Sequence, residues 1–213
     1  MAFTRITALA PLRIVWMVQI ALFLCVTFQL PAAPCQATYQ VILSAVGNGI
    51  ADDADRIQAL IDGSCANSTI DFGPAYKTYL LSHQLVLKPN RTYSGAATLK
   101  MRNPAARSYR GYPVESIFKT TFGQSSGITI AGLTLDGNGI ASGMVLNVDG
   151  GITLGIQNFT LRDCIVKNGM LKAPWVPALY AINLQNSRIL NNRFQNQPQG
   201  LVIYNHQQVL IQG

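Results

Sequence analysis

Short apolar stretches separated by polar turns cover most of this 213-residue chain. Apolar and polar residues alternate in the groups Ile70–Phe72, Thr78–Leu80, Leu85–Leu87 and Thr98–Lys100, and Gly, Pro or Asn residues separate the groups. Such alternation is typical of strands that bury one face, and the separating residues are typical of turns. The pattern therefore predicts an all-β body made of short strands.

One segment near the beginning of the chain has helical spacing instead. Asp52–Asp62 carries apolar residues at positions i, i+3 and i+4, which fall on one side of a helix. Asp52 or Asp53 can cap its first turn, and Gly63 is suited to end it. We therefore predict a short amphipathic helix whose apolar stripe consists of Ile57, Leu60 and Ile61.

The second half of the chain repeats itself. Leu179–Ile189 is similar to Leu201–Ile211, Ile156–Asp163 to Leu184–Asn191, and Ile130–Leu135 to Leu161–Val166. A shortest period of about 22 residues with alternating apolar positions indicates a solenoid, and the longer periods carry extra residues in turns. Leucine-rich repeats of similar length would need a helical return, and no return in this sequence has a helical pattern. We predict a right-handed parallel β-helix over residues 70–213, with asparagine ladders at its turns.

A stack of coils has two open ends that expose strand edges and apolar core. The predicted helix in residues 38–69 is expected to cover the first coil. Leu201–Gly213 forms only part of a coil, and no helix, proline or charged strand follows it. We therefore expect further coils beyond Gly213; the alternative is that a partner chain or a second copy covers this end.

The first 37 residues resemble a secretory leader. Arg5 and Arg13 precede the apolar run Ile14–Leu30, and small residues follow at Cys35 and Ala37. An uncleaved membrane anchor is the alternative, but the apolar run is shorter than the roughly 20 residues that span a bilayer. We predict a secreted or periplasmic protein that keeps no membrane span after cleavage.

Two cysteines remain once the predicted leader is removed. Cys65 and Cys164 would lie about three coils apart, which is roughly 14 Å at the usual strand spacing. Disulfide-bonded Cα atoms lie within about 7 Å of each other. We therefore expect both thiols to be unpaired and mostly buried.

The chain is basic, with a formal net charge of +7 at pH 7. This charge favours an acidic polysaccharide or surface glycan as partner; it does not indicate nucleic acid, because the basic residues form no tract. Arginine binds carboxylates and tyrosine stacks on sugar rings, so one loop is the predicted substrate-binding site. Its residues are Arg102, Arg107, Arg110 and Tyr109. The alternative is a solvated loop that keeps the protein soluble.

Several segments resemble the pectin-lyase-like β-helix superfamily of pectate lyase and polygalacturonase-like proteins. Ala45–Asp62 is similar to its N-terminal G-[DN]-G-x-x-D-D motif and following helix, and Leu133–Gly139 contains its D-G-N-G turn. The resemblance covers residues 45–213 and corresponds to the N-terminal portion of such proteins. It implies a secreted carbohydrate-active protein that acts on an acidic polysaccharide as a lyase or a hydrolase.

The sequence does not supply the catalytic groups that this resemblance implies. Glycoside hydrolysis needs two carboxyl groups, but Ser142, Pro177 and Gln199 occupy the expected positions before the strands. No spacing of acidic residues predicts a metal site, and no cofactor is identifiable. The catalytic residues therefore stay unknown and are expected outside this chain. The alternative function is a non-catalytic β-helix for glycan binding or adhesion.

Isolated acidic residues and histidines have simpler interpretations. Asp136, Asp149 and Asp163 are predicted to be turn residues. His83 is expected in a turn, and His206 on an inward position or at the rim of a coil. Neither histidine has an evident carboxylate partner in the sequence, so both are weak candidates for a general base.

Overall fold

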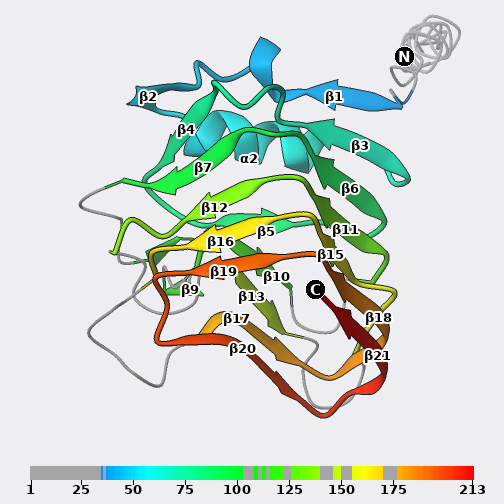
Figure 1. Cartoon of the computed structure of the whole chain (residues 1–213). Coiled ribbons are helices and arrows are strands. Elements are labelled where there is room, and N and C mark those ends of the chain that lie inside the picture. Colours follow the sequence, from blue (N-terminus) through cyan, green and yellow to red (C-terminus); the bar gives the residue numbers. More distant parts are fainter. Residues whose placement is uncertain are drawn as a thin grey trace, which may run out of the picture. The chain divides into compact units, whose positions relative to one another are not determined.

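The computed structural model describes residues 35, 37–102, 108–109, 112–113, 116–121, 126–139, 146–149, 155–169 and 177–213. These residues belong to one compact unit, Cys35–Gly213. Three parallel sheets wind around a common core, and the chain passes from sheet to sheet in each turn (Figure 1). The predicted all-β parallel β-helix with one short helix is confirmed.

Sheet A contains β1 (Thr38–Gln40), β3 (Ser68–Asp71), β6 (Arg91–Ser94), β11 (Ile128–Ala131), β15 (Thr160–Arg162) and β18 (Leu184–Leu190); β14 (Ile156–Gln157) and β21 (Gln207–Gln212) also pair with β18. Sheet B contains β2 (Asn48–Asp52), β4 (Thr78–Leu81), β7 (Thr98–Met101), β12 (Thr134–Asp136), β16 (Ile165–Lys167) and β19 (Arg193–Gln195). Sheet C contains β5 (Leu85–Leu87), β10 (Phe118–Thr120), β13 (Leu146–Asp149), β17 (Pro177–Ile182) and β20 (Gln199–Tyr204). The remaining elements are the 3-10 turn η1 (Val41–Leu43), the helix α2 (Ala54–Gly63) and a small antiparallel hairpin, β8 (Ser108–Tyr109) and β9 (Tyr112–Pro113).

The strand register agrees with the repeats of the sequence. Leu179 pairs with Leu201, Leu161 with Ile189, and Ile130 with Leu161. These are the pairs that the three alignments of similar segments predict. The repeats of the sequence are therefore the coils of the structure.

Inward side chains stack in columns, one column in each sheet. The columns are Ile70, Tyr93, Ile130, Leu161 and Ile189 in sheet A; Tyr79, Leu99, Leu135, Val166 and Phe194 in sheet B; and Leu85, Phe118, Leu146, Leu179 and Leu201 in sheet C. All are fully or partly buried, and each fully buried one contributes about 1.5–3 kcal/mol of gross hydrophobic stabilisation. The columns extend the core along the stack of coils.

Polar side chains at the turn after sheet B also stack. Asp136 Oδ1 accepts hydrogen bonds from the Asn138 backbone N–H (2.9 Å) and from Asn168 Nδ2 (2.9 Å). Asn168 Oδ1 accepts in turn from Asn196 Nδ2 (3.0 Å). Asn138, Asn168 and Asn196 have positive φ angles, which asparagine tolerates better than most residues. The predicted asparagine ladder and the turn role of Asp136 are confirmed.

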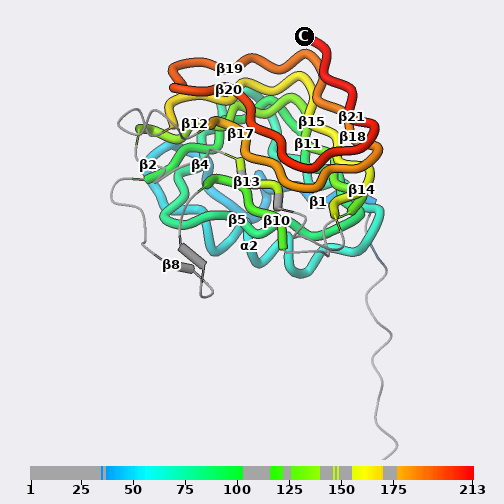
Figure 2. The backbone as a smooth tube through the Cα atoms, turned by 90° about the horizontal axis from the view of Figure 1, so that it is seen from below, coloured from blue at the N-terminus to red at the C-terminus, as the bar shows by residue number. Residues whose placement is uncertain are grey.

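The helix begins two residues later than predicted and covers the first strand of sheet C (Figure 2). Ile57 and Ile61 are completely buried and Leu60 packs beside the core, as the apolar stripe predicted. Asp53 is the N-cap residue but makes no side-chain cap bond. Its carboxylate accepts instead from the backbone N–H groups of Val46 (2.8 Å) and Gly47 (3.0 Å), which fixes the segment before the helix.

Gln58 joins this helix to the edge of sheet C. Its side-chain oxygen accepts from the Val86 N–H (2.8 Å), and its amide group donates to the Val86 carbonyl (3.2 Å). Val86 lies in β5, the edge strand of the sheet, so Gln58 supplies the partners that another strand would provide. The helix therefore covers both the apolar core and the unpaired backbone of the first coil.

The prediction for Cys65 is wrong. Cys65 forms a disulfide with Cys35, and their Cα atoms are 5.8 Å apart. Cys35 had been assigned to the leader, but pairing of β1 with β3 brings the segment before β1 close to the end of α2. Cys164 is free and buried, as predicted. None of the described helices is long and apolar enough to cross a membrane.

The last coil exposes apolar side chains. Tyr204, Leu210 and Ile211 are 51–56% exposed, whereas Ile189, the inward partner of Ile211 one coil earlier, is 2% exposed. The covering of this end by further coils, a partner or a second copy stays a prediction.

Candidate functional site

Connections of very different length join the three sheets. Sheet A passes to sheet B through short turns such as residues 95–97, 132–133, 163–164 and 191–192. Sheet B passes to sheet C through residues 102–117, 137–145 and 168–176, and residues 121–127 lead from sheet C to sheet A. Long connections on a rigid scaffold are the usual location of binding residues. The outer face of sheet C, which these connections border, is therefore the candidate site.

In sheet C, a second set of residues alternates along each strand with the inward residues. The strand register places these alternate residues in one column across the sheet. Lys119 pairs with Val86 on one side and with Asn147 on the other, and Asn147 pairs in turn with Tyr180. Tyr180 pairs with Val202 in the last coil. A cation and an aromatic ring therefore stand two coils apart in one column, roughly 10 Å along the stack. Lys119 is 5% exposed, so it lies deeper in this face than the tyrosine.

A second tyrosine lies beside this column. The rings of Tyr180 and Tyr204 have centroids 5.8 Å apart and an interplanar angle of 62°. Tyr204 is 55% exposed and Tyr180 is partly exposed. Tyr204 pairs with Ile182, and Ile182 pairs with Asp149, so an acidic residue occupies a register position two strands away. An apolar ring face next to polar groups is suited to a sugar ring.

The basic loop predicted from the sequence lies only partly within the described residues. Arg102 follows β7 of sheet B, is half exposed, and forms an ion pair with Asp52 at 3.7 Å. Tyr109 lies in β8, where its backbone pairs with Tyr112 of β9; its side chain, Arg107 and Arg110 lie outside the part that the structure describes. The loop thus contains a hairpin that the sequence did not predict.

Asp52 is held as a carboxylate by its neighbours. Partial burial acts to raise its pKa, but a hydrogen bond from the Ser82 side chain, the N–H groups of Ala54 and Ser82, and Arg102 together lower it. Both N–H groups lie 3.2 Å from Asp52 Oδ1. Asp52 therefore ties β2 to the start of α2 and to the turn after β4, a structural role.

His83 has a carboxylate partner, contrary to the interpretation of the sequence. It is 5% exposed; Nδ1 lies 2.9 Å from the Gln84 carbonyl and Nε2 lies 3.1 Å from Asp55 Oδ1. Asp55 is in the first turn of α2, so the pair joins the helix to the turn between β4 and β5. His206 is exposed in the turn between β20 and β21 of the last coil.

Carboxylates are missing where the resemblance to polygalacturonases placed them. Pro177 and Gln199 begin strands of sheet C, and Ser142 lies outside the described ranges. Among the described residues, no group of three or more His, Cys, Asp or Glu side chains is placed to hold a metal ion. The described strands of sheet C therefore hold Asp149 as a single acidic residue, where hydrolysis needs a pair.

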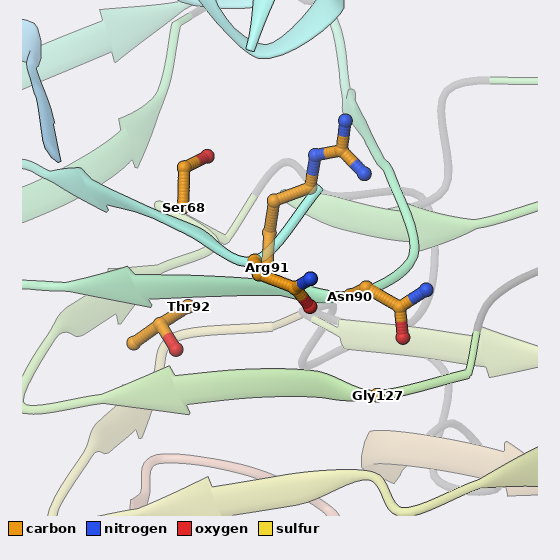
Figure 3. A pocket seen from close by; sticks show the side chains of 6 residues that line it. Ser68, Asn90, Arg91, Thr92 and Gly127 are labelled. Carbon is orange, nitrogen blue, oxygen red and sulfur yellow. The ribbon is translucent and has the colours of Figure 1, made fainter. Parts of the chain in front are cut away.

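A shallow depression of about 260 Å³ lies on a different face, at the turn before sheet A. It is lined by Asn67, Ser68, Asn90, Arg91, Thr92 and Gly127. The Arg91 guanidinium points away from Gly127 (Figure 3) and donates to the Ser64 carbonyl (2.6 Å) and Ser64 Oγ (3.2 Å). These bonds give the arginine a structural role, so this depression is a weaker candidate than sheet C.

Known proteins support the fold and leave the activity open. No family model matches this chain, and no curated protein matches it. A candidate glycosyl hydrolase from Parabacteroides merdae has a similar structure, with a TM-score of 0.56, 13% sequence identity, and coverage of 83% of this chain and 96% of that one.

Two further solved structures are similar. The A-module of a mannuronan C-5 epimerase from Azotobacter vinelandii gives a TM-score of 0.52 at 20% identity, and a protein of Geobacillus virus E2 gives 0.51 at 14%. Each match covers 81% of this chain, which spans 53% of the first structure and 42% of the second. At these identities the likeness establishes a shared parallel β-helix fold and no shared activity.

Proposed function

We propose that this chain is a carbohydrate-active β-helix protein that binds an acidic polysaccharide along the outer face of sheet C. The observation that carries the proposal is the pair of solvent-accessible tyrosines, Tyr180 and Tyr204, in the sheet that also holds Lys119. Tyrosine faces pack against sugar rings, and a lysine attracts the carboxylate of a uronic acid.

The direction of the site fits a chain-like ligand. The column from Lys119 to Tyr180 runs along the stack of coils, so successive sugars would meet successive strands. Without the leader, which holds Arg5 and Arg13, 14 basic and 9 acidic residues remain, and this formal charge of +5 also favours a polyanion. Two of the structural neighbours are named for carbohydrate chemistry, a candidate glycosyl hydrolase and a mannuronan epimerase, which adds support from the fold.

If the protein is an enzyme, the same column favours proton abstraction over hydrolysis. Epimerisation or β-elimination of a uronate needs a base near C5 and a cation that neutralises the carboxylate. Tyr180 is of a side-chain type that serves as such a base; Lys119 is a cation in the same column but stands two coils away, so it would contact the carboxylate of a different sugar. Hydrolysis needs two facing carboxylates, and Asp149 is the one acidic residue among the described positions of sheet C.

The proposed location is an oxidising compartment outside the cytoplasm, secreted or periplasmic. The Cys35–Cys65 disulfide supports it, because such bonds persist mainly in exported proteins.

Binding to immobilised polymannuronate and polygalacturonate tests the proposal, with an uncharged mannan as the comparison. We expect retention on both polyanions that weakens as salt rises. The double variant Tyr180→Ala/Tyr204→Ala should bind about tenfold more weakly, since two ring contacts are lost. Tyr76→Ala is the matched control, because Tyr76 is 77% exposed on a turn between sheets A and B.

Two results would contradict the proposal. Equal binding by the parent and the double variant would remove sheet C as the site. Equal loss in the Tyr76→Ala control would show a general surface effect. The predicted basic loop is tested in parallel: Arg102→Ser/Arg107→Ser/Arg110→Ser should weaken retention without changing the circular dichroism if the loop contributes to binding.

Ultraviolet absorbance of unsaturated uronate detects β-elimination, and NMR of the recovered polymer detects C5 epimerisation, which releases no product. Tyr180→Phe, which removes only the hydroxyl group, should abolish either activity while the circular dichroism shows that the variant still folds. A parent protein that binds both polyanions and shows neither reaction would favour the alternative, a non-catalytic glycan-binding or adhesion protein.

A further inference from the structure

The segment just before the first strand is part of the folded structure. Cys35 forms the disulfide with Cys65, which follows α2 by two residues. The Ala37 carbonyl accepts a hydrogen bond from the Thr69 N–H at 2.8 Å, which extends the pairing of β1 with β3 by one residue. The folded part of the chain therefore includes Cys35 and does not start at Thr38.

Tyr39 joins the disulfide to this first strand. Its hydroxyl group accepts from the Cys65 N–H (3.3 Å) and lies 3.4 Å from Cys65 Sγ. The side chain of Tyr39 packs against the buried core. The disulfide, the tyrosine and the strand pairing together fasten the beginning of the chain to the segment between α2 and β3.

A leader cut after Ala37 is incompatible with these contacts. It would release Cys35, leave Cys65 as an unpaired thiol, and remove the carbonyl that pairs with Thr69. It would also place a charged amino group at the start of β1. A lipid anchor on Cys35 is incompatible as well, because the sulfur that a thioether would use is bonded to Cys65.

The sequence offers another cleavage position for the leader, on the N-terminal side of Cys35. The apolar run ends at Leu30, and the small residues Ala32 and Ala33 follow directly after Pro31. Leader peptidases cut after a small residue shortly beyond the apolar segment, at an A-x-A-like site; here the third residue before the cut is Leu30 for a cut after Ala32 and Pro31 for a cut after Ala33. We propose that the leader is removed after Ala32 or Ala33, so that the processed protein keeps Cys35 and folds with the Cys35–Cys65 disulfide.

The first test measures the processed product. The full-length chain is expressed with its own leader in a host that exports proteins to an oxidising compartment, and its intact mass is determined. We expect an N-terminus at Ala33 or Pro34. Alkylation in denaturant should modify one thiol, Cys164, before reduction and three thiols after it. An N-terminus at Thr38, two free thiols, or a retained Met1 would overturn the proposal.

Variants on either side of Cys35 locate the cut independently. Ala32→Arg/Ala33→Arg places large charges where the peptidase requires small residues, so it should block processing. Ala37→Arg is the matched control; Ala37 is exposed in the folded protein, so the change should leave both processing and folding intact. Loss of processing in Ala37→Arg alone would place the cut after residue 37 and refute the proposal.

A third measurement does not depend on the native leader. A leader of the host is joined either to Ala33 or to Thr38, and the two purified products are melted. The longer product should melt at the higher temperature, and reduction should lower its melting temperature toward that of the shorter one. Equal melting temperatures before reduction would show that residues 33–37 contribute nothing, which contradicts the proposal.

Discussion

Replacement of Gln58 by methionine tests how the helix covers the first coil. Gln58 is 1% exposed, and its amide forms two hydrogen bonds to the backbone of Val86. Methionine has nearly the same length and volume, so Gln58→Met removes these two bonds, and a third from Gln58 Nε2 to Asp62 Oδ1 (3.0 Å), with little change in packing. The N–H and carbonyl of Val86 are then left without these partners at the edge of sheet C.

The expected cost follows from those two groups. A buried donor or acceptor that loses its partner costs about 1–3 kcal/mol, and the edge of β5 is only partly buried, so we expect a loss of about 2–4 kcal/mol. For a domain of this size each kcal/mol corresponds to a shift of about 2–4 °C in melting temperature. The variant should therefore melt about 4–16 °C below the parent.

Thermal unfolding followed by circular dichroism measures the global effect, and amide hydrogen exchange measures the local one. The Val86 amide should exchange faster in Gln58→Met, because it has lost its acceptor. Gln40→Met is the matched control, since Gln40 is exposed in β1 and makes no side-chain cap bond. A Gln58→Met protein that melts within about 1 °C of the parent, with unchanged protection of Val86, would refute the role assigned to Gln58.

Two further changes probe the same region. Ile57→Asp places a charge in the buried stripe of α2 and should destabilise the domain by several kcal/mol, roughly 3 or more; an unchanged urea midpoint would contradict this. The lowered pKa of Asp52 contributes stability that is present above the unfolded value of about 3.8 and lost as pH falls through the folded pKa. Asp52→Asn should therefore be less stable at neutral pH and show a weaker acid dependence below pH 4; parallel pH profiles would contradict it.

The repeats of the sequence predicted the coils because strand pairing in a β-helix is periodic. Leu179 and its neighbours recur at Leu201 and beyond, since each residue must stand above its equivalent in the previous coil. The helix was also predictable, because its apolar stripe depends on local spacing alone. The partners of its polar residues were not, since Val86 and His83 lie 28 residues beyond Gln58 and Asp55.

The candidate site was only partly visible in the sequence. The aligned repeats already place Tyr180 above Val202 and Ile182 above Tyr204, so the outward aromatic residues were a signal that could have been found. Lys119 gave no such signal, because the long connection over residues 102–117 separates β7 from β10 in its coil. Insertions of unequal length hide the register of a coil from any comparison of repeats.

Local pattern by itself determined the strands, the helix and the solenoid, because alternation and period are properties of neighbouring residues. Tertiary structure alone decided which distant groups meet. Cys35 reaches Cys65 because β1 pairs with β3, and Gln58 reaches Val86 because α2 lies against β5. Such contacts depend on the length and path of every connection in between, and these are fixed only when the coils stack.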